Sequence, residues 1–302
     1  MKRPVRVGTR RSRLARVQTE LVLRRLARSH PDHRFEAVPI ETSGDRDRTP
    51  GSSPDFTDAI DRALAGGEVD LAVHSAKDLP AELDRRLVLA ACPPRADPRD
   101  CLVVGAAVAH GRLPVGARVG SSSLRRRAQL RRWRADLSVV EIRGNVDTRI
   151  GLVRSGTIDA AILAVAGVAR LRRASEIARI LSPASFLPAP AQGALAVVAR
   201  TDEPKMVDLA RPLDHPASRA CVEAERAFSA ALGGDCWMPL GALARCQGRT
   251  LTLTGEVLTP DGRHRLRGQR AGPAASAEEL GRALGASFVR RGALRLHSRR
   301  SG

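Results

Sequence analysis

The chain has 302 residues, which is enough for two or three domains of ordinary size. Its 43% hydrophobic and 27% charged residues are typical of a globular protein and exclude a disordered or fibrous chain. The formal net charge is +19, but only 2% of the residues are aromatic and none is Tyr, which disfavours nucleic-acid binding by base stacking.

Short apolar strands alternate with helical patterns from the first residues. Residues 5–8 and 35–40 are predicted strands, separated by a helix that begins near residue 14. A helix at 55–64 then leads to a strand at 69–74, which is apolar enough to be buried on both faces. This order predicts a mostly parallel sheet covered by helices. The apolar face of the first helix would consist of Leu14, Val17, Leu21, Val22 and Leu26.

A second α/β series follows residues 92–100, a stretch rich in proline and charge that is predicted as a crossover or hinge. It contains three predicted strands, each followed by a helix. These strands are residues 118–120, 137–142 and 159–164. A second proline-rich hinge precedes a strand at 193–199, which is predicted to return to the first sheet.

The last part of the chain is predicted as a small α+β module. It would contain a helix from residue 216 to about 232, strands at 251–258 and 263–268, and a helix that ends near residue 290. Ser276 and Glu279 have the spacing of a capping box at the start of that last helix.

These elements predict an α/β protein with two lobes around a cleft and a small α+β domain at the C-terminal end. The first lobe would comprise residues 1–93 and 194–212, the second lobe 99–188, and the α+β domain 216–302. Parallel sheets bind ligands beyond the carboxyl ends of their strands, so functional residues are expected just after the strands.

Nothing in the sequence predicts a membrane span, a secretory signal or a metal site. No stretch approaches the ~18–20 apolar residues of a membrane span, and the first residues lack the apolar region of a signal peptide. The five cysteines have no zinc-ligand spacing, and free thiols are typical of the cytosol. We therefore expect a cytoplasmic protein with no metal and no membrane partner.

Arginines and hydroxyl groups gather after the predicted strands. The clearest segment is 121–126, Ser-Ser-Ser-Leu-Arg-Arg. Hydroxyls and N–H groups at a helix N-terminus bind anions, and arginine forks bind carboxylates or phosphates. An ordinary helix cap with solvated arginines explains this segment equally well, but several such turns at one cleft favour a ligand with several anionic groups. Without a P-loop or a Gly-x-Gly-x-x-Gly motif, polycarboxylates are favoured over nucleotides.

Two further segments carry side chains with chemistry of their own. Lys77 and Asp78 follow a buried strand, either as a structural ion pair or as a carboxylate that stabilises a developing cation beside a lysine that holds a substrate carboxylate. Cys236 lies in a glycine-rich loop, where a ligand can reach it more easily than a core cysteine. Local chemistry leaves the role of Cys236 open.

The chain resembles the hydroxymethylbilane synthase family, also called porphobilinogen deaminase, over nearly its whole length. Each matching segment alone is weakly specific, but the eight occur in the family's order. They are residues 8–12, 72–80, 97–100, 120–126, 142–149, 163–167, 187–194 and the loop around Cys236.

The resemblance implies two periplasmic-binding-protein-like α/β lobes and a smaller α+β domain that bears Cys236. It implies a transferase that deaminates porphobilinogen and joins four units head to tail on a dipyrromethane cofactor, held to Cys236 by a thioether. The product, hydroxymethylbilane, would enter tetrapyrrole (haem-type) biosynthesis through uroporphyrinogen III synthase. The family also implies a monomer.

The resemblance also assigns roles to residues. Asp78 would face the pyrrole nitrogens and stabilise the cation formed as ammonia leaves, and Phe56 would pack near the cofactor. The other matched positions would hold the carboxylates or line the binding site. They are Arg10, Ser12, Gln18, Lys77, Ser122, Ser123, Arg125, Arg126, Arg143, Gly144, Asn145, Arg149, Arg170 and Gln192.

The alternative is a divergent or inactive paralogue that binds polycarboxylates with the same fold. It is suggested by residues 49–56, which are shorter than the family's mobile loop and contain no lysine. Retention of Asp78 and Cys236 favours the enzyme, because binding alone requires neither. The charge of +19 predicts weak, salt-sensitive nucleic-acid binding at most, with no specific nucleic-acid partner.

Overall fold

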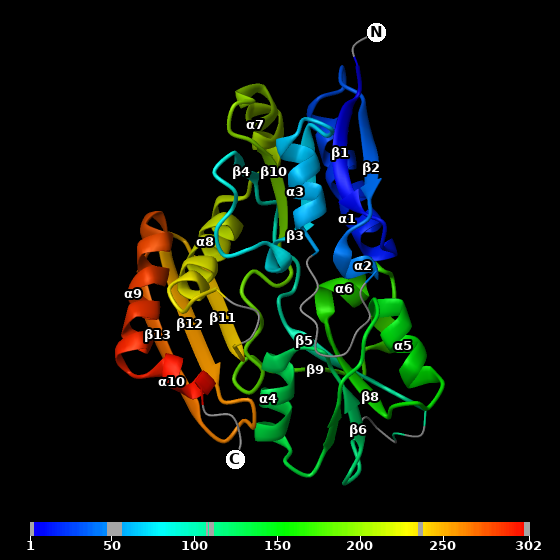
Figure 1. Cartoon of the computed structure of the whole chain (residues 1–302), viewed down its shortest axis with the longest axis vertical. Coiled ribbons are helices and arrows are strands. Elements are labelled where there is room, and N and C mark those ends of the chain that lie inside the picture. Colours follow the sequence, from blue (N-terminus) through cyan, green and yellow to red (C-terminus); the bar gives the residue numbers. More distant parts are fainter. Residues whose placement is uncertain (1–2, 47–55, 107, 109–111, 235–237, 299–302) are drawn as a thin grey trace. The chain divides into compact units, whose positions relative to one another are not determined.

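The computed structural model describes residues 3–46, 56–106, 108, 112–234 and 238–298. The chain divides into two compact units (Figure 1). The first unit is Met1–Ala96 with Gly193–Arg219, and the second is Asp97–Gln192 with Ala220–Gly302. Within the described ranges, no helix is long and apolar enough to cross a membrane.

A five-stranded sheet in the order β2-β1-β3-β10-β4 forms the centre of the first unit. Strand β1 runs parallel to β2 and β3, whereas β10 is antiparallel to β3 and β4. The predicted return of the later strand to this sheet is therefore confirmed, but the sheet is mixed rather than mostly parallel. The strands are Val5–Arg10 (β1), Phe35–Ile40 (β2), Leu71–Ser75 (β3), Leu87–Ala91 (β4) and Leu195–Arg200 (β10).

Helices cover both faces of this sheet. Val7 of β1 shares a core with Val22 and Leu26 of α1, while a Cβ placed on the adjacent Gly8 would lie 3.2 Å from Ile60 of α3. Because successive residues of a strand point to opposite faces, α1 and α3 lie on opposite sides. The helices are Arg13–Ser29 (α1), Ser43–Arg46 (α2), Asp58–Ala65 (α3) and Pro204–Ala210 (α7), with 3-10 turns at Ala76–Asp78 (η1) and Arg211–Leu213 (η4).

The predicted apolar face of α1 is wrong at Leu21, which is 36% exposed. The helix instead turns two polar side chains, Gln18 and Thr19, inward. Gln18 Nε2 donates to Ser75 Oγ (3.0 Å), and Thr19 Oγ1 donates to Thr9 Oγ1 (2.7 Å). These hydrogen bonds satisfy the buried polar groups, and hydropathy alone does not predict them.

A second five-stranded sheet, β7-β6-β8-β5-β9, lies in the second unit. Strand β6 is parallel to β7 and β8, and β5 is antiparallel to β8 and β9. Helix α4 packs on one face, through Leu130, and α5 on the other, through Ile150 and Val153. The elements are Asp100–Val104 (β5), Arg118–Gly120 (β6), Leu124–Trp133 (α4), Ser138–Val140 (β7), Val146–Arg154 (α5), Ala160–Ala164 (β8), Val165–Arg170 (α6), Ala174–Glu176 (η3) and Arg179–Ile180 (β9).

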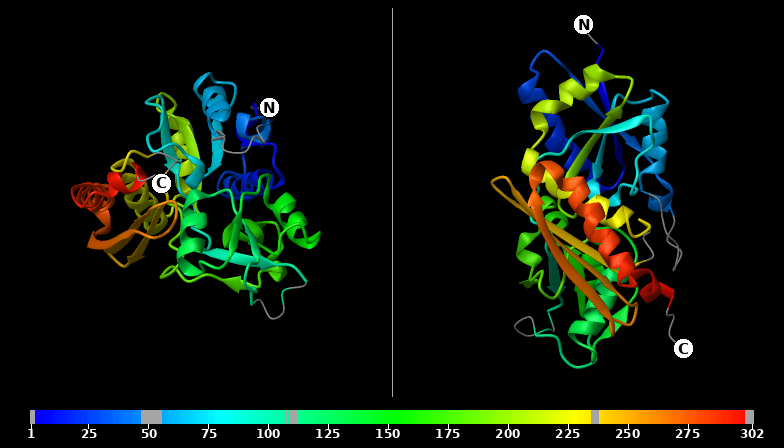
Figure 2. Two further views of the ribbon diagram at one scale, coloured as in Figure 1. Left: turned by 60° about the horizontal axis from the view of Figure 1, so that its bottom comes forward. Right: turned by 90° about the vertical axis from the view of Figure 1, so that its left-hand side faces the viewer.

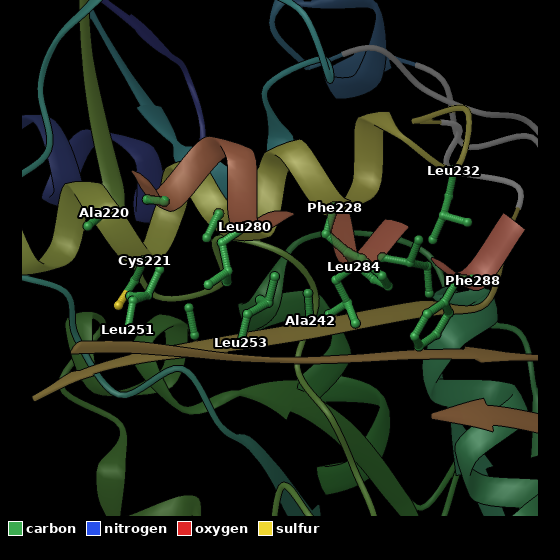
Figure 3. Close-up of a cluster of buried hydrophobic side chains, with 14 of the residues drawn as sticks. Ala220, Cys221, Phe228, Leu232, Ala242, Leu251, Leu253, Leu280, Leu284 and Phe288 are labelled. Carbon is green, nitrogen blue, oxygen red and sulfur yellow. The ribbon is translucent and has the colours of Figure 1, made fainter. Parts of the chain in front are cut away.

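The C-terminal part of the second unit is an antiparallel sheet, β11-β12-β13, with α8 and α9 on one face (Figures 2 and 3). Its core includes Phe228 of α8 and Phe288 of α9, which meet edge to face with centroids 5.1 Å apart. Gly255 lies beneath Phe228, where a Cβ would clash with the ring at 2.4 Å. The elements are Pro216–Ala230 (α8), Leu240–Gln247 (β11), Thr250–Leu258 (β12), Arg265–Pro273 (β13), Ala274–Ser276 (η5), Ala277–Arg290 (α9) and Ala293–Ser298 (α10).

The predicted capping box at the start of α9 is wrong. Ser276 precedes the helix, but its side chain makes no capping hydrogen bond. The 3-10 turn η5 ends at Ser276 and gives it φ −105° and ψ 33°, whereas a capping serine is normally extended.

The second unit contains both the predicted second lobe and the predicted α+β domain. Their apolar cores are separate, but polar bonds join them. Arg131 Nη1 donates to the Pro260 carbonyl (2.6 Å), and the Ala242 amide donates to the Pro188 carbonyl (2.9 Å). The division into three domains stays a prediction.

Candidate functional site

The carboxyl ends of three parallel strands, β6, β7 and β8, meet at one edge of the second unit's five-stranded sheet. Helices α4, α5 and α6 begin shortly after these strands. Helix N-termini expose N–H groups and the positive end of the peptide dipoles, so this edge attracts anions. We call it the strand-end edge.

The three serines after β6 build the first turn of the strand-end edge. Ser121 is fully buried, and its Oγ accepts the amide of Ser123 (3.2 Å). Ser123 is the N-cap of α4, with its Oγ accepting the amide of Arg126 (3.4 Å). Ser122 Oγ accepts a hydrogen bond from Arg149 Nη2 (2.9 Å), which joins this turn to α5.

The turn before α5 also contacts Arg149, through the carbonyl of Gly144. Gly144 has φ +97°, a conformation that favours glycine, and its carbonyl accepts from Arg149 Nε (2.9 Å). Asn145 caps α5 by accepting the Thr148 amide at 2.9 Å. Ser122 and Gly144 therefore fix the Nε and Nη2 edge of the Arg149 guanidinium. Arg143, in the same turn, forms an ion pair with Glu141 (2.7 Å).

Asp100 lies at the start of β5 and holds two of the predicted binding arginines. Its Oδ2 accepts from Arg125 Nη1 (2.8 Å), and its Oδ1 accepts from Arg126 Nη2 (2.7 Å). Gln192 Nε2 donates to the same carboxylate (2.9 Å), and its Oε1 accepts from Arg126. Asp100 is fully buried, while Arg125 and Arg126 are 4% and 5% exposed.

The charges of this cluster favour an ionised carboxylate. Burial alone would raise the pKa of Asp100, but the adjacent Arg125 and Arg126 outweigh it and hold that pKa well below its usual range. Burial lowers the pKa of Arg125, which still remains protonated because guanidinium is so strong a base. Two cations against one anion leave this buried cluster with excess positive charge.

Arg170 is half-buried at the C-terminal end of α6. The chain that follows is tied to α5, because Arg173 pairs with Asp147 (2.7 Å) and Glu176 (2.6 Å). The second unit thus brings together the predicted residues Ser122, Ser123, Gly144, Asn145 and Arg149, and a second group of Arg125, Arg126 and Gln192 around Asp100.

In the first unit, the predicted residues lie after β1 and β3, two parallel neighbours. Ser12 caps α1 by accepting the Ala15 amide (3.3 Å). The Arg10 guanidinium lies over the Phe56 ring, 4.1 Å from its centroid, in a cation–π contact. Gln18 is 4% exposed and bonds to Ser75 at the end of β3, so its amide braces the strand end.

The 3-10 turn η1 carries Lys77 and Asp78 directly after β3. Lys77 is exposed and Asp78 is half-buried, so solvent or a ligand can reach both residues. Before the turn, His74 Nε2 lies 3.1 Å from Asp61 Oδ1 in the interior, so β3 and α3 pack side by side there. The predicted burial of β3 on both faces is confirmed from Leu71 to His74.

Cys236 lies outside the described residues, as does most of the predicted loop 49–56. On either side of the Cys236 loop, Leu232 and Leu240 are buried in the core of the C-terminal module. Sequence reasoning gave no role to Asp100, the most connected acid of the site. Its segment, residues 97–100, belongs to the resemblance, but strand β5, which begins at Asp100, was not predicted, so the position of this acid at a strand end was missed as well.

The chain is similar in sequence to known proteins over nearly its whole length. A family model described as "Porphobilinogen deaminase, dipyromethane cofactor binding domain" matches residues 5–208, and "Porphobilinogen deaminase, C-terminal domain" matches residues 219–290. A porphobilinogen deaminase of Roseiflexus castenholzii is 46% identical over 289 residues, covering 94% of this chain and 95% of that protein. One of Thermus thermophilus is 44% identical over 291 residues, covering 96% and 97%. Among solved structures, the VFT2 domain of Bordetella pertussis BvgS has a TM-score of 0.43 at 15% identity, over 69% of this chain and 86% of that chain.

Proposed function

The chain belongs to the porphobilinogen deaminase family, and from that premise we propose that it deaminates porphobilinogen and joins four units head to tail on a covalent dipyrromethane. Hydroxymethylbilane is then released by hydrolysis. The reaction makes it a transferase of tetrapyrrole biosynthesis.

The observation that carries the proposal is the set of arginine and hydroxyl donors at the strand-end edge. Each pyrrole of the substrate bears an acetate and a propionate, so the growing chain gains negative charge with every unit. Arg149, held by Ser122 and Gly144, offers a fixed fork for one such carboxylate. The excess positive charge of the Asp100 cluster and the N-termini of α4 and α5 act in the same direction.

The donor set fits the dipyrromethane, which is itself a tetracarboxylate. The buried Nε–H of Arg125 has no hydrogen-bond acceptor within the described part of the chain, although buried donors normally have one. A ligand carboxylate would satisfy it. When bound, the dipyrromethane supplies the pyrrole carbon at which the chain is extended. We propose Cys236 as its attachment point through a thioether.

Asp78 is the proposed catalytic residue. It is half-buried at the carboxyl end of β3, where a carboxylate can touch a bound pyrrole while Lys77 beside it holds a substrate carboxylate. As ammonia leaves the aminomethyl group of porphobilinogen, positive charge develops on the pyrrole, and the Asp78 carboxylate stabilises it. Arg10 and Phe56, stacked at the end of β1, would form the adjacent wall of the binding site.

We propose a cytoplasmic monomer whose product passes to uroporphyrinogen III synthase. The binding roles of Ser12, Gln18, Ser123, Arg126, Arg143, Asn145, Arg170 and Gln192 belong to the same proposal.

Incubation of the purified protein with porphobilinogen tests the function directly. We expect release of ammonia together with hydroxymethylbilane, the latter identified by mass spectrometry. Binding of porphobilinogen with no ammonia released would overturn the proposal and favour the polycarboxylate-binding alternative, which the family match does not favour.

A further inference from the structure

Four buried polar side chains connect β5, α4 and the C-terminal sheet within the second unit. Asp100 on β5, Arg125 and Gln129 on α4, and Glu256 on β12 are each 4% exposed or less. Arg125 Nη1 donates to Asp100 Oδ2 (2.8 Å) and to Gln129 Oε1 (2.9 Å). Gln129 Nε2 in turn donates to Glu256 Oε1 (2.9 Å).

The Gln129 amide has only one favourable orientation in this series of hydrogen bonds. Its oxygen faces the Arg125 guanidinium, and its NH2 group faces the Glu256 carboxylate and the Leu187 carbonyl (3.0 Å). A flipped amide would set donor against donor and acceptor against acceptor in a buried place, which is costly.

Glu256 is fixed by contacts that do not involve α4. Its Oε2 pairs with Nη1 of Arg267 (3.1 Å) and of Arg265 (3.7 Å), both on β13. Arg267 also donates to the carbonyls of Pro183 (3.0 Å) and Ala184 (2.7 Å). The Glu256 carboxylate, which orients Gln129, is therefore held in place by Arg265 and Arg267 and does not depend on α4.

Hydrogen bonds to described residues hold the Arg125 guanidinium at Nη1. Nη1 has two hydrogens and three acceptors, Asp100, Gln129 and the Leu187 carbonyl (2.7 Å), so two of these acceptors share one hydrogen, whereas Nε–H has no acceptor in the described residues. Because a guanidinium is planar and rigid, fixing Nη1 also fixes the direction of Nε–H.

We propose that Gln129, oriented by Glu256, is a positioning residue that holds Nη1 of Arg125 and thereby directs its remaining N–H donors toward a carboxylate of the pyrrole chain. This rests on the proposed function, in which Arg125 binds such a carboxylate. Gln129 itself does not touch substrate.

Arg131 supplies a matched control. It lies on the same helix and also bonds to the C-terminal module, at the Pro260 carbonyl (2.6 Å), but no bond joins it to Arg125. Arg131→Met therefore weakens the contact between α4 and the C-terminal part of the second unit, but it leaves the contacts of the Arg125 guanidinium unchanged.

The test measures kcat and KM for porphobilinogen in wild type, Gln129→Met, Glu256→Gln and Arg131→Met. We expect Gln129→Met to raise KM by roughly tenfold, the loss expected for a displaced charge-assisted hydrogen bond, with kcat changed much less. Glu256→Gln should raise KM less, because an amide there still accepts from Gln129. Arg131→Met should leave KM unchanged.

Gln129→Met leaves Glu256 with an unpaired buried oxygen and is expected to destabilise the fold. The double variant Gln129→Met/Glu256→Met removes both partners of this hydrogen bond, but Arg265 and Arg267 then lose the carboxylate with which they pair. Thermal unfolding of every variant is therefore measured beside KM, and KM is compared among the variants that are folded at the assay temperature. The positioning role predicts that the KM of the double variant stays high.

The outcomes separate the two proposals. A wild type that turns over while Gln129→Met keeps a normal KM, or a double variant that regains a normal KM, overturns the positioning role and leaves the function intact. Equal KM changes in Gln129→Met and Arg131→Met would show a general structural effect instead. A wild type that binds porphobilinogen without turnover overturns the function, and the positioning role with it.

Discussion

Asp78 and Asp84 are both carboxylates of the first unit, but only Asp78 follows the buried strand β3 into the proposed site. Asp84 is held in an exposed ion pair with Arg86 (2.6 Å), and hydrogen bonds from Arg86 lower the pKa of Asp84 to about 2. Both oxygens of Asp84 already accept hydrogen bonds from Arg86, so this acid has a local partner. The position of a carboxylate relative to a strand end is thus more informative than its presence.

Asp78→Ala should reduce turnover of porphobilinogen by about 10²–10⁴-fold, the contribution typical of a positioned acid–base or electrostatic group. The thermal unfolding midpoint should stay close to that of the wild type, because Asp78 is only half-buried. Asp84→Ala serves as the control and should retain turnover. Substantial activity in Asp78→Ala would show that another group stabilises the cation.

Asp100 makes the stability of the second unit depend on pH in a defined direction. Its folded pKa lies below the usual value of 3.8, so the unfolded chain binds the proton more tightly. Stability from this group is present above pH 3.8 and is lost as the pH falls through the lower folded pKa. The free energy of unfolding of the second unit should therefore rise with pH in that acidic range.

Asp100→Asn should destabilise the unit by about 3–5 kcal/mol at neutral pH, because two buried arginines lose their counter-ion. Denaturant unfolding of wild type and variant, followed from neutral pH to below 3.8, measures the difference. The gap between the two proteins should narrow at the acidic end. A gap of constant size across the range would contradict the proposed charge state of Asp100.

At the scale of elements, the turn before α5 is shaped by Gly144. A Cβ there would lie 2.7 Å from Thr148 Cγ2, and its φ of +97° is unfavourable for any other residue. Gly156, in the turn after α5, has φ +73°, but no atom lies within 4 Å of the Cβ that an alanine would add. Alanine at Gly156 would therefore add backbone strain alone, whereas alanine at Gly144 would add strain and also displace the turn that holds Arg149.

Gly144→Ala should lower stability and raise KM for porphobilinogen severalfold, because the Gly144 carbonyl accepts from Arg149 Nε. Gly156→Ala should cost about 1–2 kcal/mol of stability and leave KM unchanged. Steady-state kinetics and thermal unfolding of both variants provide the measurement. A normal KM in Gly144→Ala would remove Arg149 from the binding residues.

Elements with a strong local signal were predictable from the sequence. Phe35–Ile40 and Arg118–Gly120 are strands at the predicted residues, and a helix, α4, follows Arg118–Gly120 as predicted. Strand Leu87–Ala91 was missed because it pairs with β10, more than a hundred residues further along the chain. Strand Leu240–Gln247 was missed although it pairs in a hairpin with β12, which follows it directly. Short strands that depend on distant pairing have little pattern of their own.

The candidate site was predictable only as a set of residue types. The sequence places Arg125 and Arg126 at the start of a helix and Gln192 far along the chain, but Asp100 brings the three together through a buried carboxylate. Burial and ion pairing at such distances follow from the tertiary structure. Gln129 and Glu256 lie beyond sequence reasoning for the same reason.

At the scale of the whole molecule, the two five-stranded sheets share one plan. In each, three parallel strands are followed across the sheet by a strand of opposite direction, in the orders β2-β1-β3-β10-β4 and β7-β6-β8-β5-β9. Each sheet thus presents one edge where parallel strands end and arginines, serines or Asp78 follow. The α/β class predicted from alternating strands and helices is confirmed.

The central claim is that this chain builds its product on a pyrrole primer bound covalently to Cys236. The intact mass of the purified protein and of Cys236→Ser, before and after incubation with porphobilinogen, tests it most directly. We predict that the wild type carries the added mass of a dipyrromethane, with further pyrrole units after incubation, and that Cys236→Ser carries none. A wild type that stays unmodified after incubation, or a covalent adduct that persists in Cys236→Ser, would contradict the claim.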